Sequence, residues 1–559
     1  MKNQVLGKLV GNTGDPNNLT AVLNSSFGGR RGEFVRLRHQ ERADDPPVDV
    51  LGRIVAIHRS NVLYNSGMGR GVNDLELMPG AQVTGENLHA KLEVVGYKDP
   101  STGRIRVPRR PLDPGANVET VDFHFLSEFY EFREETSLHL GNLIGYDRGD
   151  NIVPVYLDVT NLVTEHVAIL AMTGAGKSYT VGRIIERLVG LHNATVVVFD
   201  PHGEYGKALA GGKLGFGDTS AVEDPRDERT LPRIQDTLTR LTEAGAGIRV
   251  YTPQDASFRH KYAGENEELA LQFDQFEMDD LSAILPGLTE PQQRVLDVAI
   301  RYWRRIEKEP RDINRLRDLL GDGLDDLKGW DQLTDAESSA LNGRSAAVAS
   351  MKLRRLLMEA RAFYNVSLPT PTDMARLVGR AGDRKGRMII VDLQGLSETA
   401  KQVITALISS EILRKASSKT DPIRPVFMVY EEGHTFAPSG EAAISLRIIK
   451  KVAGEGRKFG VGFAIVSQRP SKLDPDVTSQ CNTIIAMRLK NPDDQRFILR
   501  VSDMFSKADV DELPGLSTGE ALVSGRSIVA PLLVKVGLKA LVHGGESPRV
   551  LDVWGQFDG

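Results

Sequence analysis

Cysteine is almost absent from this chain: among 559 residues there is one, Cys481. A single cysteine cannot form an internal disulfide, and it also excludes the cysteine-rich class of zinc sites. Chains without disulfides are typical of reducing compartments. We interpret Cys481 as a small hydrophobic residue of the interior rather than as a catalytic thiol.

Long hydrophobic runs are absent as well. No apolar stretch approaches the roughly 18 residues that a membrane span needs, so we expect none. The first residues, MKNQVLGKLVGNTGDPNN, lack an apolar segment followed by a small-residue cleavage site, which makes the cytoplasm the expected location. The formal net charge of −5 neither excludes nor supports nucleic acid, because an acidic protein can still hold a locally positive channel.

Short alternating runs dominate the first part of the chain, residues 1–145. GEFVRLRH, LGRIVAIHR, KLEVVGY and ETVDFHFL are separated by clusters of Gly, Pro, Asn and Asp. Such runs are typical of β-strands and turns. Several short strands in one block predict a small β-barrel, because closure removes the exposed edges.

A different pattern follows residue 145. HVAILAM, ATVVVFD, IRVYTP, RMIIVDL, PVFMVYEE and GVGFAIVSQ read as strands, with amphipathic helices between most of them. This alternation predicts an α/β domain with a parallel sheet covered by helices. Strand signals stop over 276–378, where helical periodicity predicts an all-helical insertion. The sheet domain then occupies 146–275 and 379–540, and 541–559 form a C-terminal tail.

A glycine-rich loop separates one predicted strand from one predicted helix. AMTGAGKS follows HVAIL and leads into YTVGRIIERL. The N–H groups of such a loop and of the helix N-terminus converge on an anion. This is a Walker A sequence, with Ala171 in place of the first glycine; Lys177 can reach the β and γ phosphates, and Ser178 can ligate Mg²⁺. The predicted nucleotide-binding residues are Thr173, Gly174, Ala175, Gly176, Lys177, Ser178 and Tyr179.

Acidic residues end two other predicted strands. VFMVYEEGH places Glu431 and Glu432 directly after an apolar run, the position of a Walker B element. We predict that Glu431 holds Mg²⁺ and that Glu432 polarises the attacking water. TVVVFD delivers Asp200 to the same carboxyl edge, where ligands of open α/β sheets sit. Asp200, or Glu204 in the PHGEY that follows it, either supports the magnesium shell or the water, or caps the turn after this strand.

Two further residues are candidates for the same chemistry. GFAIVSQRP ends a strand with Gln468, which is placed to sense the γ phosphate. Phosphoryl transfer also uses a positive charge beside the phosphates, and GEGRKFGVGF supplies Arg457 just before the Gln468 strand. From there Arg457 can point to a phosphate in the same subunit or in the next one, or it is an ordinary solvated helix end.

The order of these motifs resembles that of a known family. HVAILAMTGAGKS, FDPHGEY, VYEEGHTF, GEGRKFGVGFAIVSQRP and GEALV follow one another as in the HerA family of hexameric DNA translocases, relatives of FtsK and the conjugation ATPases. The resemblance spans about residues 140–540, and the N-terminal segment looks like the small barrel that precedes the motor in that family. It implies a RecA-like ATPase that uses ATP and Mg²⁺ and forms a homohexamer around double-stranded DNA. It also implies the nucleotide and catalytic roles given above to Lys177, Ser178, Asp200, Glu431, Glu432, Arg457 and Gln468.

The resemblance implies a partner too. Family members act with a separate nuclease or a sirtuin-like effector, in DNA end processing or antiviral defence, and no nuclease motif is evident in this chain. We therefore expect a separate effector chain, docked on the barrel. The alternative function is an ATP-binding ring scaffold that regulates an effector enzyme with little DNA translocation. No DNA-binding residue is assigned.

One position departs from the family pattern. Archaeal relatives carry an arginine just before the Walker A strand that acts on the neighbour's ATP, and this chain has Glu165 and His166 there. Either another arginine acts in trans, or the ring hydrolyses ATP more slowly, or its control differs. The remaining interpretation is that Glu165 is an ordinary acidic residue on the surface.

Overall fold

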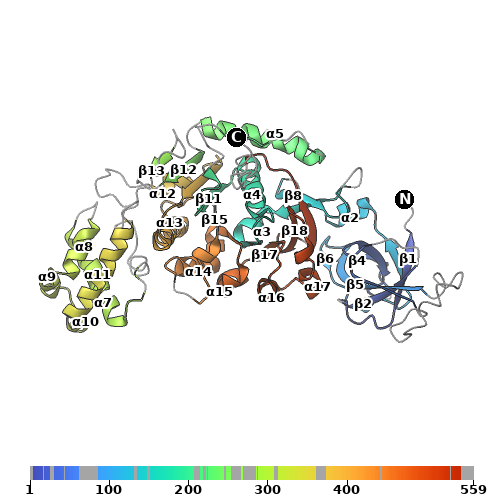
Figure 1. Cartoon of the computed structure of the whole chain (residues 1–559), viewed down its shortest axis with the longest axis horizontal. Helices are drawn as coiled ribbons and strands as arrows, with labels where there is room; N and C mark the ends of the chain where they lie inside the picture. The colour runs from blue at the N-terminus through green and yellow to red at the C-terminus, as the bar shows by residue number, and fades with distance from the viewer. Residues whose placement is uncertain are drawn as a thin grey trace, which may run out of the picture.

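Two β-sheets organise the chain, a small one near the N-terminus and a large one in the middle (Figure 1). In this computed structural model a bundle of helices lies at the opposite end from the small sheet. The structure describes residues 4–542, except for 17, 25–29, 43, 62–85, 131–134, 148–151, 207–213, 218–221, 223, 244–246, 253–265, 269–284, 286, 308–311, 361–372, 441–442 and 529.

The small sheet closes on itself. Its order is β2-β1-β7-β3-β4-β5-β6, all pairs are antiparallel, and β2 also pairs with β5. Alternate residues Leu19, Ala21 and Leu23 of β2 point into the interior, as period-two strands require. The predicted small barrel is confirmed. Its strands are β1 (Val5–Val10), β2 (Leu19–Leu23), β3 (Phe34–His39), β4 (Val48–Asn61), β5 (Glu86–Lys98), β6 (Ile105–Arg106) and β7 (Asn117–Thr120).

The end of the barrel segment differs from the sequence-based expectation. ETVDFHFL is split, because β7 ends at Thr120 and helix α2 spans Phe123–Phe129. Asp122 starts this helix by accepting a hydrogen bond from Phe125 N at 2.8 Å. The next strand, β8 (Ser137–Leu143), pairs with β19 and β9 of the large sheet, although the sequence places it in segment 1–145. A strand pattern does not reveal which sheet the strand joins.

The large sheet is parallel in one part and antiparallel in the other. Its order is β13-β12-β14-β11-β15-β16-β10-β17-β18-β19-β8-β9. The parallel arrangement is confirmed for all six strands that the sequence predicts, namely β10, β11, β12, β14, β15 and β16. The sequence does not predict the antiparallel part, which extends from the β17–β18 pair to β9. The connection between β8 and β9 is too short for a parallel crossover. The remaining strands are β9 (Pro154–Asp158), β10 (Val167–Leu170), β11 (Thr195–Asp200), β12 (Ile248–Thr252), β13 (Asn266–Glu268), β14 (Arg387–Asp392), β15 (Val426–Tyr430), β16 (Val461–Ser467), β17 (Thr483–Met487), β18 (Glu520–Gly525) and β19 (Leu532–Val536).

Helices cover both faces of the large sheet. In β11, Val196 and Val198 pack with α4 and α5, whereas Val197 and Phe199 pack with α13 and α14. The two faces of one strand therefore belong to two different cores. Cys481 is buried, as expected. The helices of this domain are α3 (Val159–Thr164), α4 (Lys177–His192), α5 (Pro225–Glu243), α12 (Met374–Val378), α13 (Glu398–Ser417), α14 (Leu446–Glu455), α15 (Pro475–Ser479), α16 (Pro492–Val501), α17 (Lys507–Val510), and the short η5 (Gly433–Thr435), η6 (Gly456–Phe459), η7 (Pro470–Lys472) and η8 (Leu513–Gly515).

The helical bundle is the insertion that the sequence predicts. Over the described residues 287–307 and 312–360 the structure contains helices and turns and no strand. Trp303 lies in its core, and its indole N–H donates to the carbonyl of Asp312 at 3.0 Å. The helices are α7 (Glu290–Ile306), α8 (Ile313–Leu320), α9 (Leu324–Lys328), α10 (Asp335–Ala340) and α11 (Gly343–Ala360).

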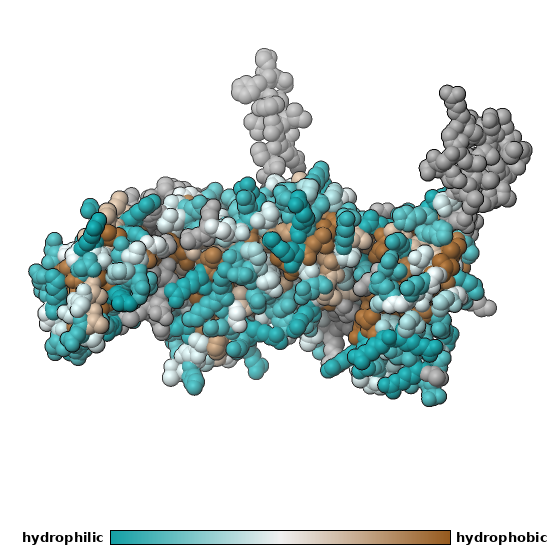
Figure 2. Space-filling view, turned by 90° about the horizontal axis from the view of Figure 1, so that it is seen from below, coloured by the Kyte–Doolittle hydropathy of each residue, from teal (hydrophilic) through white to brown (hydrophobic). Residues whose placement is uncertain are grey.

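The barrel is held against the large domain by charged contacts. Arg53 of β4 lies 2.5 Å from Asp509 of α17 and 2.8 Å from Glu93 of β5. Hydrophilic residues dominate the face seen in Figure 2, and hydrophobic residues lie between them in small groups. Within the described part of the chain, none of the helices has the length and hydrophobicity to span a lipid bilayer.

Candidate active site

Parallel strands bring the predicted site residues to one edge. Leu170 of β10 is paired with Ser467 of β16, and Tyr430 of β15 is paired with Phe199 of β11. The residue after each of these strand ends therefore lies at the carboxyl edge. That edge is the usual place for a ligand in an open α/β sheet.

The glycine-rich loop has the conformation that a phosphate cradle requires. β10 ends at Leu170 and α4 begins at Lys177. Gly174 and Gly176 have φ angles of +76° and +100°, which residues with a Cβ rarely adopt. A Cβ on Gly176 would also stand 3.2 Å from the backbone N of Gly519, so this glycine permits close packing of loop and neighbour. The loop N–H groups and the start of α4 thus form an anion site.

Lys177 lies between Glu431 and Glu432. Its ammonium donates a hydrogen bond to Glu431 Oε1 and another to Glu432 Oε1, the latter at 2.8 Å. All three side chains are buried. One cation and two carboxylates therefore form a compact charged group directly beside the anion site.

Burial and pairing act differently on the two glutamates. Burial raises the pKa of Glu431 to about 7, against the attraction of Lys177. Burial also acts to raise the pKa of Glu432, but the Lys177 ammonium outweighs it and the pKa falls below its ordinary value. Burial acts to lower the pKa of Lys177, and the two carboxylates reverse this and raise it. Glu432 is therefore the more firmly ionised carboxylate.

Gln468 connects the second glutamate to the glycine-rich loop. Its side-chain amide donates to Glu432 Oε1 at 2.6 Å, and its carbonyl oxygen accepts a hydrogen bond from the Thr173 hydroxyl. Glu432 itself has φ +51°, which is uncommon for a residue other than glycine and is found at functional sites. His434 Nδ1 lies 3.4 Å from Glu432 Oε2, a contact that the sequence does not predict.

Asp200 lies at the same edge but does not touch Lys177. Its carboxylate accepts hydrogen bonds from His202 N at 3.2 Å and Tyr205 N at 2.9 Å, so it caps the turn after β11. Burial raises its pKa to about 6, and the Asp392 carboxylate adds to the rise. The turn presents Tyr205, whose hydroxyl donates to Glu431 Oε2 at 2.8 Å. Asp200 thus contacts the site through Tyr205.

The first turn of α4 contacts the C-terminal part of the chain. Ser178 and Tyr179 are half-buried there. The Tyr179 hydroxyl accepts a hydrogen bond from the backbone N of Lys539 at 2.8 Å. The hydroxyl of Thr518, just before β18, donates a hydrogen bond to Gly174 O of the loop at 3.0 Å. The sequence does not predict this contact.

Arg457 lies at the opposite edge of the sheet. It precedes β16, while Gln468 follows this strand of seven residues. At about 3.3 Å per residue the strand separates the two edges by roughly 20 Å, which an arginine side chain does not bridge. Arg457 contacts Glu165 at 2.9 Å instead. The prediction that Arg457 acts on the phosphates of its own chain is therefore wrong, while action on a neighbouring subunit and an ordinary solvated helix end both stay predictions.

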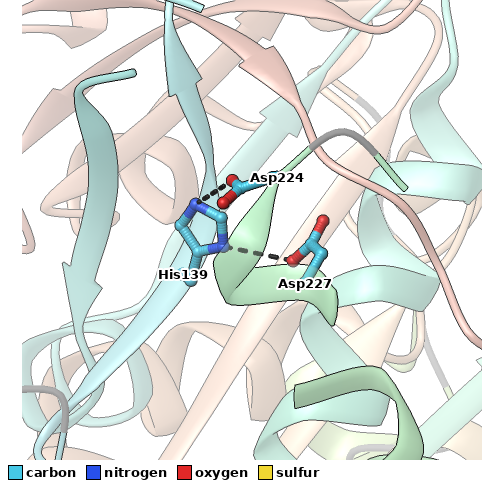
Figure 3. Close-up of side chains that lie close together, drawn as sticks. All are labelled: His139, Asp224 and Asp227. Atoms are coloured by element: carbon cyan, nitrogen blue, oxygen red, sulfur yellow. Dashed lines mark hydrogen bonds and ion pairs between the residues drawn. The ribbon is translucent and has the colours of Figure 1, made fainter. Parts of the chain in front are cut away.

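A second buried cluster stands apart from this edge, where β8 meets the start of α5 (Figure 3). His139 lies between Asp227, 3.2 Å from its Nδ1, and Asp224, 3.4 Å from its Nε2. Arg183 and Arg187 also contact Asp227, at 2.9 and 2.8 Å. Two guanidinium groups already supply the positive charge that a metal ion would bring. We interpret this cluster as an ion-pair network that joins α4, α5 and β8.

The carboxyl edge fits a nucleotide with Mg²⁺. The anion site at the start of α4 has the backbone geometry for phosphates, and Lys177 adds an ammonium beside it. The Ser178 hydroxyl and the Glu431 carboxylate are oxygen groups of the kind that Mg²⁺ prefers, and they would hold it here. The residues present therefore suit the group that the motifs imply.

Comparisons with known proteins identify the family. The model of the central domain of helicase HerA matches residues 138–412. The DNA double-strand break repair helicase HerA of Pyrococcus furiosus is 30% identical, over 96% of this chain and 94% of that protein. The chain belongs to the HerA family. The HerA helicase of Sulfurisphaera tokodaii is 24% identical over 94% of this chain and 92% of its own length.

A solved structure is similar at lower identity. The bacterial conjugative coupling protein TrwB aligns with a TM-score of 0.49 and 14% identity, over 76% of this chain and 93% of that chain. The HerA relatives align over nearly the whole chain, which includes the barrel.

Proposed function

We propose that this HerA-family protein is an ATP-driven translocase or helicase that acts on double-stranded DNA. The observation that carries the proposal is the meeting of Lys177, Glu431, Glu432 and Gln468 beside the glycine-rich loop. The P. furiosus relative is named a DNA double-strand break repair helicase, which supports DNA as the molecule along which this protein moves.

Phosphate binding changes the partners of Lys177. Without nucleotide, two carboxylates neutralise the ammonium. A triphosphate at the start of α4 would offer Lys177 more anionic oxygens, which would free Glu431 to hold Mg²⁺ together with Ser178. Mg²⁺ held there would supply charge neutralisation beside the γ-phosphoryl group.

Glu432 is suited to activating water. An ordinary glutamate is ionised at neutral pH, so the Glu432 carboxylate can orient the attacking water and accept its proton. Gln468 fixes one of its oxygens and also contacts Thr173 of the loop. A change at the γ phosphate can therefore reach Glu432 through Gln468, which is the sensor role proposed for this residue.

The position of Arg457 supports a ring. Because this arginine cannot reach its own loop, it acts on the nucleotide of an adjoining copy, where a positive charge stabilises the transition state. Repeating one head-to-tail contact closes a ring, and we propose a homohexamer around duplex DNA. The phosphates of the duplex give a sequence-independent grip. A separate nuclease or sirtuin-like effector on the barrel, a role in DNA end processing or antiviral defence, and a cytoplasmic location remain predictions from the sequence.

The test compares ATP hydrolysis with and without duplex DNA. Wild-type protein should hydrolyse ATP, and duplex DNA should accelerate it. Lys177→Ala should abolish hydrolysis, while the control Lys415→Ala, at the C-terminal end of α13 and paired with Asp421, should not. Full hydrolysis by Lys177→Ala would refute the site. Hydrolysis that duplex DNA leaves unchanged favours the ring scaffold instead.

A further inference from the structure

A buried carboxylate holds two exposed arginines at the amino edge of the large sheet. Glu165 ends α3 directly before β10, and its side chain is 3% exposed. Its Oε1 lies 2.9 Å from Arg457 Nη2 and 3.4 Å from Arg526 Nη1. The two arginine side chains are 61% and 63% exposed. The carboxylate is therefore inside the protein and the guanidinium groups reach its surface.

Backbone contacts fix the meeting point. Asn482 N donates to Glu165 O at 2.9 Å, and Asn482 O accepts from Arg526 N at 2.9 Å. A Cβ on Gly462 would stand 1.5 Å from Val163 O, so this glycine lets the end of α3 lie directly on β16. Four segments distant in sequence are thus held together by main-chain geometry as well as by charge.

The arrangement leaves hydrogen-bond donors facing outward. Two guanidinium groups and one carboxylate give the group a net positive charge. Within the described part of the chain each guanidinium contacts one carboxylate, Glu165, although it carries five N–H donors. Glu165 Oε2 is buried and has no hydrogen-bond partner there. Outward-facing planar donors match phosphate oxygens.

The phosphate must come from another molecule, because the glycine-rich loop of the same chain lies at the far edge. We propose that Arg457 and Arg526 together contact the phosphates of a nucleoside triphosphate held by an adjoining copy, and that Glu165 is the positioning residue that aims them. This inference rests on the proposed function and adds a second arginine and its support. The phosphates of the DNA backbone have the same chemistry, and the test below distinguishes them from those of a nucleoside triphosphate.

Mixed rings test the inference. One subunit type carries Arg526→Ala and keeps its loop; the other carries Lys177→Ala and keeps its arginines. The two are co-expressed with different tags and purified through both. Arg526→Ala alone should lower kcat on the order of 10²-fold, as expected for a lost transition-state donor. The mixture should exceed the sum of the two pure variants several-fold, because intact arginines then face intact loops.

Glu165→Gln separates positioning from folding. It should lower kcat about tenfold, a smaller loss than that of the arginine itself, without changing the affinity for a fluorescent ATP analogue. Mixing Glu165→Gln subunits with Lys177→Ala subunits should restore the rate of ATP hydrolysis, because the Lys177→Ala subunits keep intact arginines. If Glu165→Gln damaged the subunit's own nucleotide site instead, mixing would not restore the rate. Arg526→Lys, which keeps the charge, should retain more activity than Arg526→Ala. The control is Arg240→Ala, which removes an exposed side chain of α5 and should leave kcat at the wild-type value.

Several results would overturn the inference. These are wild-type turnover by Arg526→Ala, a mixture equal to the sum of its parts, or a Glu165→Gln defect that the mixture does not restore. Loss of duplex-DNA affinity with normal ATP turnover would assign the arginines to nucleic acid and also overturn it. Absence of hydrolysis in the wild type would refute the proposed function itself, and this inference with it.

Discussion

The two edges of the large sheet carry opposite arrangements of charge. At the carboxyl edge one ammonium lies between two carboxylates, and all three groups are buried. At the amino edge one buried carboxylate holds two exposed guanidinium groups. The first group is neutralised internally, whereas the second has a net positive charge and donors at the surface. Under the proposed function, one chain therefore carries both halves of a head-to-tail contact.

Glu432→Gln breaks the carboxyl edge most strongly. Glutamine keeps the shape of the side chain but cannot accept a proton from water, so kcat should fall about 10³-fold while ATP still binds. Turnover and binding of a fluorescent ATP analogue measure the two effects. Glu290→Gln, an exposed glutamate in the insertion, is the matched control. Near-normal turnover would remove Glu432 from the chemistry.

Arg457→Ala breaks the amino edge. It should lower kcat about 10²-fold or more, because a charge beside the neighbour's phosphates is lost. Affinity for the ATP analogue should change little, since the loop that binds it is intact. Arg240→Ala again serves as control. Loss of nucleotide binding with unchanged kcat would contradict action from the opposite edge.

Glu431→Gln tests the effect of burial on the pKa of a carboxylate at the carboxyl edge. The raised pKa of Glu431, about 7 against an ordinary 4.5, means that the folded protein binds more protons than the unfolded chain between these values. Its contribution to stability is thus complete below about pH 4.5 and is lost as the pH rises through about 7. Between pH 5 and 8 the free energy of unfolding of nucleotide-free wild type should fall by about 1 to 3 kcal/mol relative to Glu431→Gln.

Denaturant unfolding of both proteins across this pH range, in the presence of a chelator, measures that difference. A difference that stays constant or grows in the opposite sense would show that Glu431 is not a carboxyl group with a raised pKa.

Tyr205→Phe has the smallest expected effect. It removes the hydrogen bond that the hydroxyl donates to Glu431 at 2.8 Å. One hydrogen bond contributes about 0.5 to 1.5 kcal/mol, so the Mg²⁺ concentration for half-maximal hydrolysis should rise by roughly threefold to tenfold. Tyr302→Phe in α7 is the control. An unchanged Mg²⁺ requirement would leave Tyr205 without a role in orienting Glu431.

The carboxyl edge could be largely predicted from the sequence, because its residues follow apolar strands. In a parallel sheet, strand ends share one edge, so Lys177, Glu431 and Gln468 meet without knowledge of the loops between them. Tyr205 could not be found this way, since its contact depends on the turn that Asp200 caps. Asp200 caps this turn in the structure, and its support of the magnesium shell or of the water stays a prediction.

The amino edge and the sheet margin were much less predictable. Arg526 lies in a turn between antiparallel strands, and no local pattern links it to Glu165, more than 300 residues away. The strand at 137–143 has an ordinary alternating pattern, and only its pairing with β19 assigns it to the large sheet. Contacts between distant segments are set by packing, which single-sequence periodicity does not contain.

The most direct test of the account is a structure of the assembled protein with Mg²⁺ and a slowly hydrolysed ATP analogue. The account predicts that Lys177 has left Glu431 and Glu432 for the phosphates, and that Arg457 from the adjoining copy approaches the same phosphates. A triphosphate bound away from the glycine-rich loop, or flanked by no arginine of a neighbouring copy, would contradict it.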